Sequence, residues 1–124
     1  MNEIIAEFHY WDYGDFNRTA MEIRPQIQAE ELMAIAQQFD VHVKVEKIRA
    51  SYFPLMRFSS RAVSYGKFII RVSGTNVDAI KTCVGKIFIR YGRPDEVPMA
   101  FFGSKGAGKV IINTLLKDFK RGKR

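Results

Sequence analysis

Residues 67–91 read KFIIRVSGTNVDAIKTCVGKIFIRY and carry the clearest structural signals in the chain. The first seven residues predict a β-strand, and Gly74-Thr75-Asn76 predicts a turn in which Asn76 or Thr75 caps a helix. Gly92-Arg93-Pro94 then predicts the end of that helix. The apolar stripe that defines the helix over three turns consists of Val77, Ile80, Val84, Ile87 and Phe88.

The segments before this one alternate between strand and helix patterns. Residues 4–11 (IIAEFHYW) alternate between two faces, which predicts a strand with Ile4, Ala6, Phe8 and Tyr10 on one side. Residues 41–48 (VHVKVEKI) alternate between apolar and polar residues, which predicts a half-exposed strand. Between them, Arg24-Pro25 predicts a helix start, because proline is tolerated in the first turn, and Asp40 ends that helix. Residues 49–66 favour a short strand at 50–53 and a short helix at 55–63.

This order over residues 1–92 predicts one α+β domain. The expected architecture is an open-faced sandwich, with a mostly antiparallel four-stranded sheet and helices on one face. Residues 93–124 form a basic C-terminal extension: an apolar segment or strand at 97–102, a hinge at 103–108 and an amphipathic helix over about 109–120.

The basic charge is concentrated in that extension. Residues 1–92 contain 12 Lys/Arg and 10 Asp/Glu, whereas residues 93–124 contain 8 and 3. A local excess of this kind favours an anionic partner such as nucleic acid. The residues expected to contact nucleic acid are Lys105, Lys109, Lys117, Lys120, Arg121, Lys123 and Arg124.

Other functional classes receive little support. One cysteine, no signal-peptide pattern and no apolar run of about 18 residues predict a cytoplasmic protein without disulfide or membrane span. We expect no metal site, cofactor or small-molecule substrate. Cys83 is expected to be buried, and His9 and His42 to face solvent or be hydrogen-bonded. The aromatic residues expected either to stack on bases or to form core and interface are Phe8, Tyr10, Trp11, Tyr13 and Phe16.

Residues 103–109 (GSKGAGK) match the pattern G-x-x-x-x-G-K of phosphate-binding loops. Val110 stands where a Ser or Thr would bind magnesium, and too few residues follow for the later metal-binding acid. A flexible hinge is therefore favoured, with a simple anion-binding nest as the alternative. The GxxG of Gly103–Gly106 also fits the RNA-clamping loop of KH domains, but the chain lacks the elements that would follow it.

The order of elements resembles that of the histidine-containing phosphocarrier protein (HPr) family of the bacterial sugar phosphotransferase system. Glu22-Ile23-Arg24-Pro25 stands where the family has His-x-Arg-Pro at the first helix. Pro54-Leu55-Met56 stands where it has a regulatory serine and two apolar residues. The stretches that extend the resemblance are Phe39-Asp40 with the valines after it, and Ile70–Gly74 followed by Asp78-Ala79-Ile80.

The departures from the family pattern bear on function. The resemblance implies the HPr fold without phosphocarrier activity, because Glu22 replaces the phosphorylated histidine and Pro54 the serine. At a helix start, Glu22 would be stabilised by about 0.3–1 kcal/mol, with Arg24 as its partner. The Glu22 carboxylate is then either a mimic of the phosphosite or an ordinary helix-start acid.

These observations together predict a non-enzymatic binding protein with an HPr-like body. Its basic C-terminal region would bind nucleic acid or assemble a nucleoprotein complex. The alternative is a regulatory protein–protein adaptor that presents a phosphocarrier docking surface. In that case the apolar side of the C-terminal helix packs on the body or forms a homodimer contact.

Overall fold

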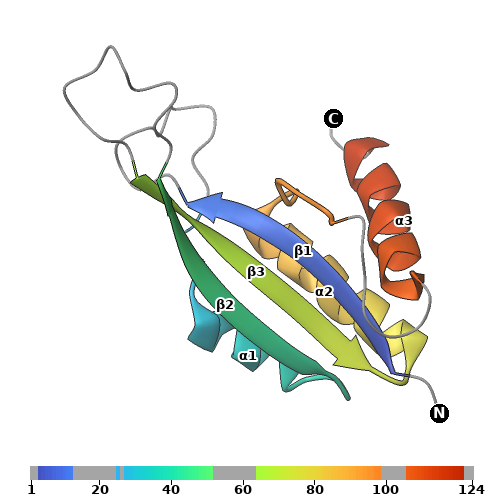
Figure 1. The fold of residues 1–124 in the computed structure, drawn as a ribbon. Helices are drawn as coiled ribbons and strands as arrows, with labels where there is room; N and C mark the ends of the chain where they lie inside the picture. Colours follow the sequence, from blue (N-terminus) through green and yellow to red (C-terminus); the bar gives the residue numbers. More distant parts are fainter. Residues whose placement is uncertain (1–2, 13–24, 26, 52–63, 99–105, 122–124) are drawn as a thin grey trace.

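The computed structural model describes residues 3–12, 25, 27–51, 64–98 and 106–121 (Figure 1). These residues form three strands and three helices. In chain order they are β1 (Ile4–Asp12), α1 (Ala29–Ala36), β2 (His42–Ser51), β3 (Ser64–Gly74), α2 (Val77–Tyr91) and α3 (Ala107–Arg121).

The strands form an antiparallel sheet in the order β1-β3-β2. Across the described residues the sheet thus has three strands instead of the expected four. The separate strand predicted at 50–53 is wrong at its start, because Ala50 and Ser51 continue β2 and pair with β3. The short helix predicted at 55–63 lies outside the described residues. The next described residue, Ser64, is the first residue of β3.

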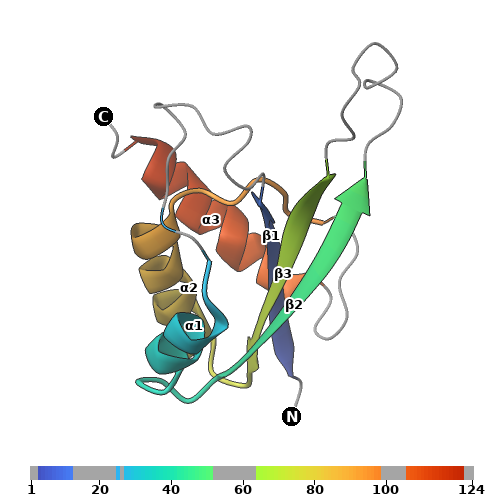
Figure 2. The same cartoon turned by 90° about the vertical axis from the view of Figure 1, so that its left-hand side faces the viewer.

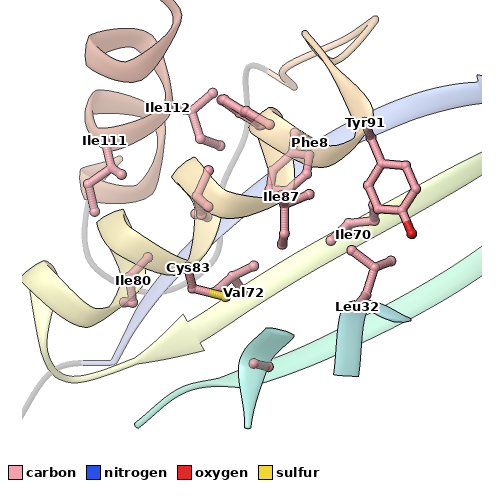
Figure 3. Packing of buried hydrophobic residues seen from close by; sticks show 14 of the residues in the cluster. Phe8, Leu32, Ile70, Val72, Ile80, Cys83, Ile87, Tyr91, Ile111 and Ile112 are labelled. Atoms are coloured by element: carbon pink, nitrogen blue, oxygen red, sulfur yellow. The ribbon is translucent and has the colours of Figure 1, made fainter. Parts of the chain in front are cut away.

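One face of the sheet is covered by helices. α1 and α2 lie on that face, and α3 runs along the outer side of β1 (Figures 1 and 2). The alternation predicted for β1 is confirmed, since Ala6, Phe8 and Tyr10 are fully buried beneath the helices. Figure 3 shows the resulting core, in which side chains of all three helices meet those of β1 and β3.

Local sequence explains the ends of α2. The Asn76 side chain accepts hydrogen bonds from the N–H groups of Asp78 and Ala79 at 2.9 and 3.2 Å, as an N-cap does. Gly92 ends the helix with a φ of 88°, a conformation that favours glycine. Both ends agree with the sequence prediction.

The start of α1 differs from the prediction. The helix begins at Ala29, and its N-cap Gln28 is extended, so Pro25 does not lie in the first turn. Ile27 is buried in the core before the helix begins, and the extended chain at Gln28 follows from that anchoring. The two acidic residues of the first turn, Glu30 and Glu31, lie where the helix dipole favours them.

The C-terminal helix begins earlier than predicted and is docked on the body. α3 starts at Ala107, so the last two residues of the predicted hinge are helical. Gly108 is buried against the backbone of β1, and Ile111 and Ile112 belong to the same core as the sheet. The strand predicted at 97–102 is absent at Val97 and Pro98; only Glu96 makes a bridge, to His9.

Candidate nucleic-acid interface

The helical layer carries its charge unevenly. The sequence of α1 has two acidic residues and no basic one, whereas α2 has three basic and one acidic. α3 has four basic residues and one acidic. Because α2 and α3 lie next to each other (Figure 2), most of the positive charge of the helical layer is on two neighbouring helices, although Arg90 of α2 faces α1.

The exposed sides of these helices present lysines. Lys81 and Lys86 are exposed on α2, and Lys117 is exposed on α3. None of the three forms an ion pair with another described residue. Lys109, in the first turn of α3, is half-buried. We call Lys81, Lys86 and Lys117 the α2–α3 basic surface; lysines without a carboxylate partner among the described residues are suited to phosphate contact.

The amphipathic sequence of α3 determines how Lys117 is presented. Gly108, Ile111 and Ile112 are buried against β1 and α2, and Leu115 packs on the same core. A helix with one face anchored in this way turns its other face to solvent. Lys117 is on that solvent face.

Arg90, the remaining basic residue of α2, has a different role. Its guanidinium forms two hydrogen bonds with the carboxylate of Glu31, at 2.9 and 3.1 Å. The Tyr91 hydroxyl donates to the same carboxylate. Burial raises the pKa of Tyr91 to about 12, and the hydrogen bond to Glu31 is the second cause of this increase. These contacts join α1 to α2, so Arg90 is a structural residue.

The opposite face of the sheet is electrically balanced. Arg71 bridges Glu7 at 2.8 Å and Glu46 at 3.4 Å, and Lys67 contacts Glu96 at 2.7 Å. His9 connects the two pairs: its Nε2 lies 2.8 Å from Glu7, and its Nδ1 lies 3.2 Å from Glu96. The residues of this network, which face away from the helices, are Glu7, His9, Glu46, Lys67, Arg71 and Glu96. Lys44 lies opposite Arg71 on the same face and forms no ion pair with another described residue.

The carboxylates in this network are stabilised as anions. Burial opposes ionisation of Glu7, but hydrogen bonds from His9 and Arg71 outweigh it and hold its pKa below the usual range. The hydrogen bond from the ammonium group of Lys67 lowers the pKa of Glu96 to about 2, and the hydrogen bond with His9 is the second cause. Because Lys67 and Arg71 are already neutralised by carboxylates, these two cations are poorly suited to bind a polyanion.

The network also fastens the chain that leads toward α3. The His9 N–H donates to the carbonyl of Glu96 at 2.8 Å, and the Asp95 N–H donates to the carbonyl of His9 at 2.9 Å. The Trp11 N–H donates to the Asp95 side chain at 2.7 Å. Residues 95–96 therefore cover part of the outer edge of β1.

The structure tests the sequence-predicted site residues unevenly. Lys109 and Lys117 are described and lie on α3. Lys120 and Arg121 belong to the same helix, but their side chains are outside the described part. The predicted residues that lie wholly outside it are Lys105, Lys123, Arg124, Glu22 and Arg24. α1 starts at Ala29, so the helix start that the sequence predicted at Arg24-Pro25 is not found at Pro25.

The phosphate-loop pattern is only partly described, at Gly106–Lys109. Gly106 has a φ of 80°, and the next three residues form the first turn of α3. At Gly108 an added Cβ would lie 1.8 Å from the carbonyl oxygen of Ile5. Gly106, a variable position of the pattern, thus directly precedes the helix, and Gly108, the second glycine of the pattern, lets α3 approach β1.

The aromatic residues divide between core and surface. Phe8 and Tyr10 are fully buried, and Phe8 makes edge-to-face contact with Phe88 at 5.2 Å between ring centroids. These rings are therefore inaccessible to bases. Trp11 is half-buried, and Tyr13 and Phe16 lie outside the described residues. Cys83 is fully buried as predicted, and burial raises its pKa to about 11.

The sequence reasoning missed Lys81 and Lys86 as candidate site residues. Both follow from the helical periodicity of α2, which places them outside its apolar stripe, Lys81 at one flank of the stripe and Lys86 toward the far side. It also missed the ion-pair network, because the contact of Glu96 with His9 joins segments 87 residues apart. His9 is nevertheless hydrogen-bonded, and His42 is exposed, as expected.

No family model, curated protein or solved structure matches this chain significantly. In the part of the chain that the structure describes, no helix has the length and apolarity needed to cross a membrane. The same residues contain no cluster of three or more His, Cys, Asp or Glu side chains that could hold a metal ion.

Proposed function

We propose that this chain is a non-enzymatic nucleic-acid-binding protein that contacts the phosphate backbone through the α2–α3 basic surface and the basic residues after it. The observation that carries the proposal is the distribution of charge. Lys81, Lys86 and Lys117 form no ion pair with another described residue, whereas carboxylates neutralise Lys67 and Arg71 on the open sheet face, where Lys44 is the unpaired lysine among those described. Without a base-reading motif, the binding depends on charge and shape more than on sequence.

The finer fold assignment, an HPr-like body without phosphocarrier activity, is also part of this proposal. An antiparallel sheet with helices on one face supports it. The start of α1 at Ala29 is an argument against it, since the matching Arg24-Pro25 motif does not open the helix. Binding through the α2–α3 basic surface does not depend on this assignment.

The proposal has a quantitative test in the salt dependence of binding. Three lysines that each neutralise one phosphate give a slope of log K against log salt of about −2.7 on duplex DNA. That slope corresponds to an affinity loss of about 40-fold between about 50 and 200 mM salt. Fluorescence anisotropy of labelled duplex and single-stranded oligonucleotides with the full chain measures both quantities. Absence of binding at the lower salt concentration contradicts the proposal and favours the protein–protein adaptor.

Matched charge removals locate the surface. Lys117→Gln is expected to weaken binding of all sequences alike and to reduce the magnitude of the slope by about one. Lys47→Gln is the control, because Lys47 is an exposed lysine on β2, the strand at the opposite edge from α3. Its slope should equal that of the unmodified chain. If both variants lose the same amount of binding affinity, binding depends on the net charge of the protein and not on the α2–α3 basic surface.

A further inference from the structure

We propose that this protein forms a homodimer through antiparallel pairing of β2 with β2 of a second copy. Among the described residues, β2 is paired on one side only, with β3, so a ten-residue strand has one open edge. An open edge of that length is a template for another strand.

The hydrogen bonds of β1 reveal which backbone groups of β2 face outward. The His9 N–H donates to Glu96, away from β3, so the backbone groups of Phe8 point toward β3 and its partner Ile70. Alternation along β3 then directs the backbone groups of Arg71 toward β2 and its partner Lys44. The N–H and C=O groups of Val45, next to Lys44, therefore point out of the sheet.

One two-fold register satisfies both the backbone and the charges. With Val45 opposite Val45 of the second copy, the outward N–H and C=O groups of the two residues meet as a hydrogen-bonded pair. Lys44 then lies opposite Glu46 of the second copy, and the symmetry produces this pair twice. Registers centred on Lys44 or on Glu46 instead place like charges opposite each other, which is destabilising.

The environment of Lys44 supports this register. Lys44 is exposed, lies opposite Arg71 within the sheet, and forms no ion pair with another described residue. Arg71, by contrast, is bound by Glu7 and Glu46. Glu46 is about half-exposed, at 51% of its side-chain surface, and so remains open to a second cation. Glu46 of the second copy supplies Lys44 with a carboxylate that none of the other described residues provides.

The two-fold axis would be perpendicular to the joined sheet. Both copies of α2 then lie on the same side, because such an axis does not exchange the faces of a sheet. The dimer is independent of nucleic-acid binding: a chain that dimerises without binding nucleic acid, or the reverse, separates the two proposals.

Sedimentation velocity of the full chain without nucleic acid tests the dimer. Protein concentrations up to about 1 mM are used, so that a dimer with a dissociation constant as weak as about 1 mM is still detected. Lys44→Glu and Glu46→Lys each place like charges opposite each other and are expected to raise the dissociation constant at least tenfold. An equimolar mixture of the two variants restores opposite charges at both positions, so it is expected to form a heterodimer of near-original affinity. Lys81→Glu, the same charge reversal on α2, is the control and leaves the dimer unchanged.

A backbone variant tests the strand pairing itself. Val45→Pro removes the outward N–H, leaves the bonds between β2 and β3 in place, and is expected to abolish the dimer while circular dichroism retains the folded spectrum. A chain that is monomeric at every concentration overturns the proposal. So does a dimer that survives Val45→Pro, or a mixture of the charge variants that stays as weak as either alone.

Discussion

Gly108→Ala tests whether α3 is an integral part of the fold, and it is expected to lower the free energy of unfolding by about 2–5 kcal/mol. The added Cβ would lie 1.8 Å from the Ile5 carbonyl oxygen and 2.7 Å from the Ala6 Cα. Both are backbone atoms of β1 and have no rotamer that relieves the clash. α3 must therefore move away until the contact with Ile5 approaches 3.4 Å, the start of ordinary van der Waals separation.

The cost follows from what moves with Gly108. Ile111 and Ile112 are 7% and 0% exposed and lie within about one turn of it. A gap of about 0.5–1 Å already forfeits a quarter to a half of the dispersion energy of a contact, and this displacement is larger. The loss is thus comparable to truncation of a buried isoleucine, for which about 2–5 kcal/mol is typical.

Urea unfolding followed by circular dichroism measures this effect, with an expected midpoint decrease of about 1–3 M. Gly85→Ala is the matched control. A Cβ at position 85 meets nothing within 4 Å, and alanine in a helix interior gains about 0.5–1 kcal/mol over glycine. If Gly108→Ala is as stable as the unmodified chain to within about 0.5 kcal/mol, the docking of α3 on β1 is refuted.

Three further predictions concern titratable groups. Stability should fall as the pH drops from 4.5 toward about 2, because the unfolded chain takes up a proton on Glu96 before the folded one does. Glu96→Gln should reduce this loss of stability in an acid titration. If stability depends on pH in the same way in the variant, Glu96 is not the group responsible. Tyr91→Phe should lower the free energy of unfolding by about 1 kcal/mol at neutral pH, because the hydrogen bond to Glu31 is lost. The unmodified protein should lose stability between pH 10 and about 12, because Tyr91 ionises first in the unfolded chain, and Tyr91→Phe should remove this loss. Cys83 should react with a thiol reagent only when the chain unfolds, and rapid labelling of the folded protein would contradict its burial.

Local patterns predicted the elements that are governed by local physics. The alternation of residues 4–11 identified the buried face of β1, and the apolar stripe after Asn76 identified the buried side of α2. The cap at Asn76 and the stop at Gly92 were predictable because both depend on neighbouring backbone groups. Each of these features is encoded within a few residues.

Features that depend on distant contacts were not predictable in the same way. α1 begins four residues after Pro25, since the core holds Ile27 in a non-helical position. The glycines before Lys109 suggested a flexible hinge, whereas Gly108 is buried because β1 lies against it. Neither effect has a signal in the adjacent sequence.

The candidate site was predictable in its charge but not in its extent. The surplus of Lys and Arg after residue 92 pointed to the C-terminal region as the site of binding. Lys117 is exposed on α3, as a residue that contacts nucleic acid must be. The contribution of Lys81 depends on the packing of α2 beside α3, which only the fold provides. The neutrality of the opposite face likewise depends on contacts such as that between Arg71 and Glu7.

If nucleic acid contacts the helices and not the open face of the sheet, the two faces should respond differently in an amide NMR titration of the isotope-labelled full chain with a DNA duplex at low salt. Shifts are expected around Lys81, Lys86 and Lys117 and should disappear as salt is raised, while the signal of Arg71 stays unchanged. Shifts centred on Arg71 and the rest of the open face, or a spectrum that does not respond to the duplex at all, would show that the helices are not the binding surface.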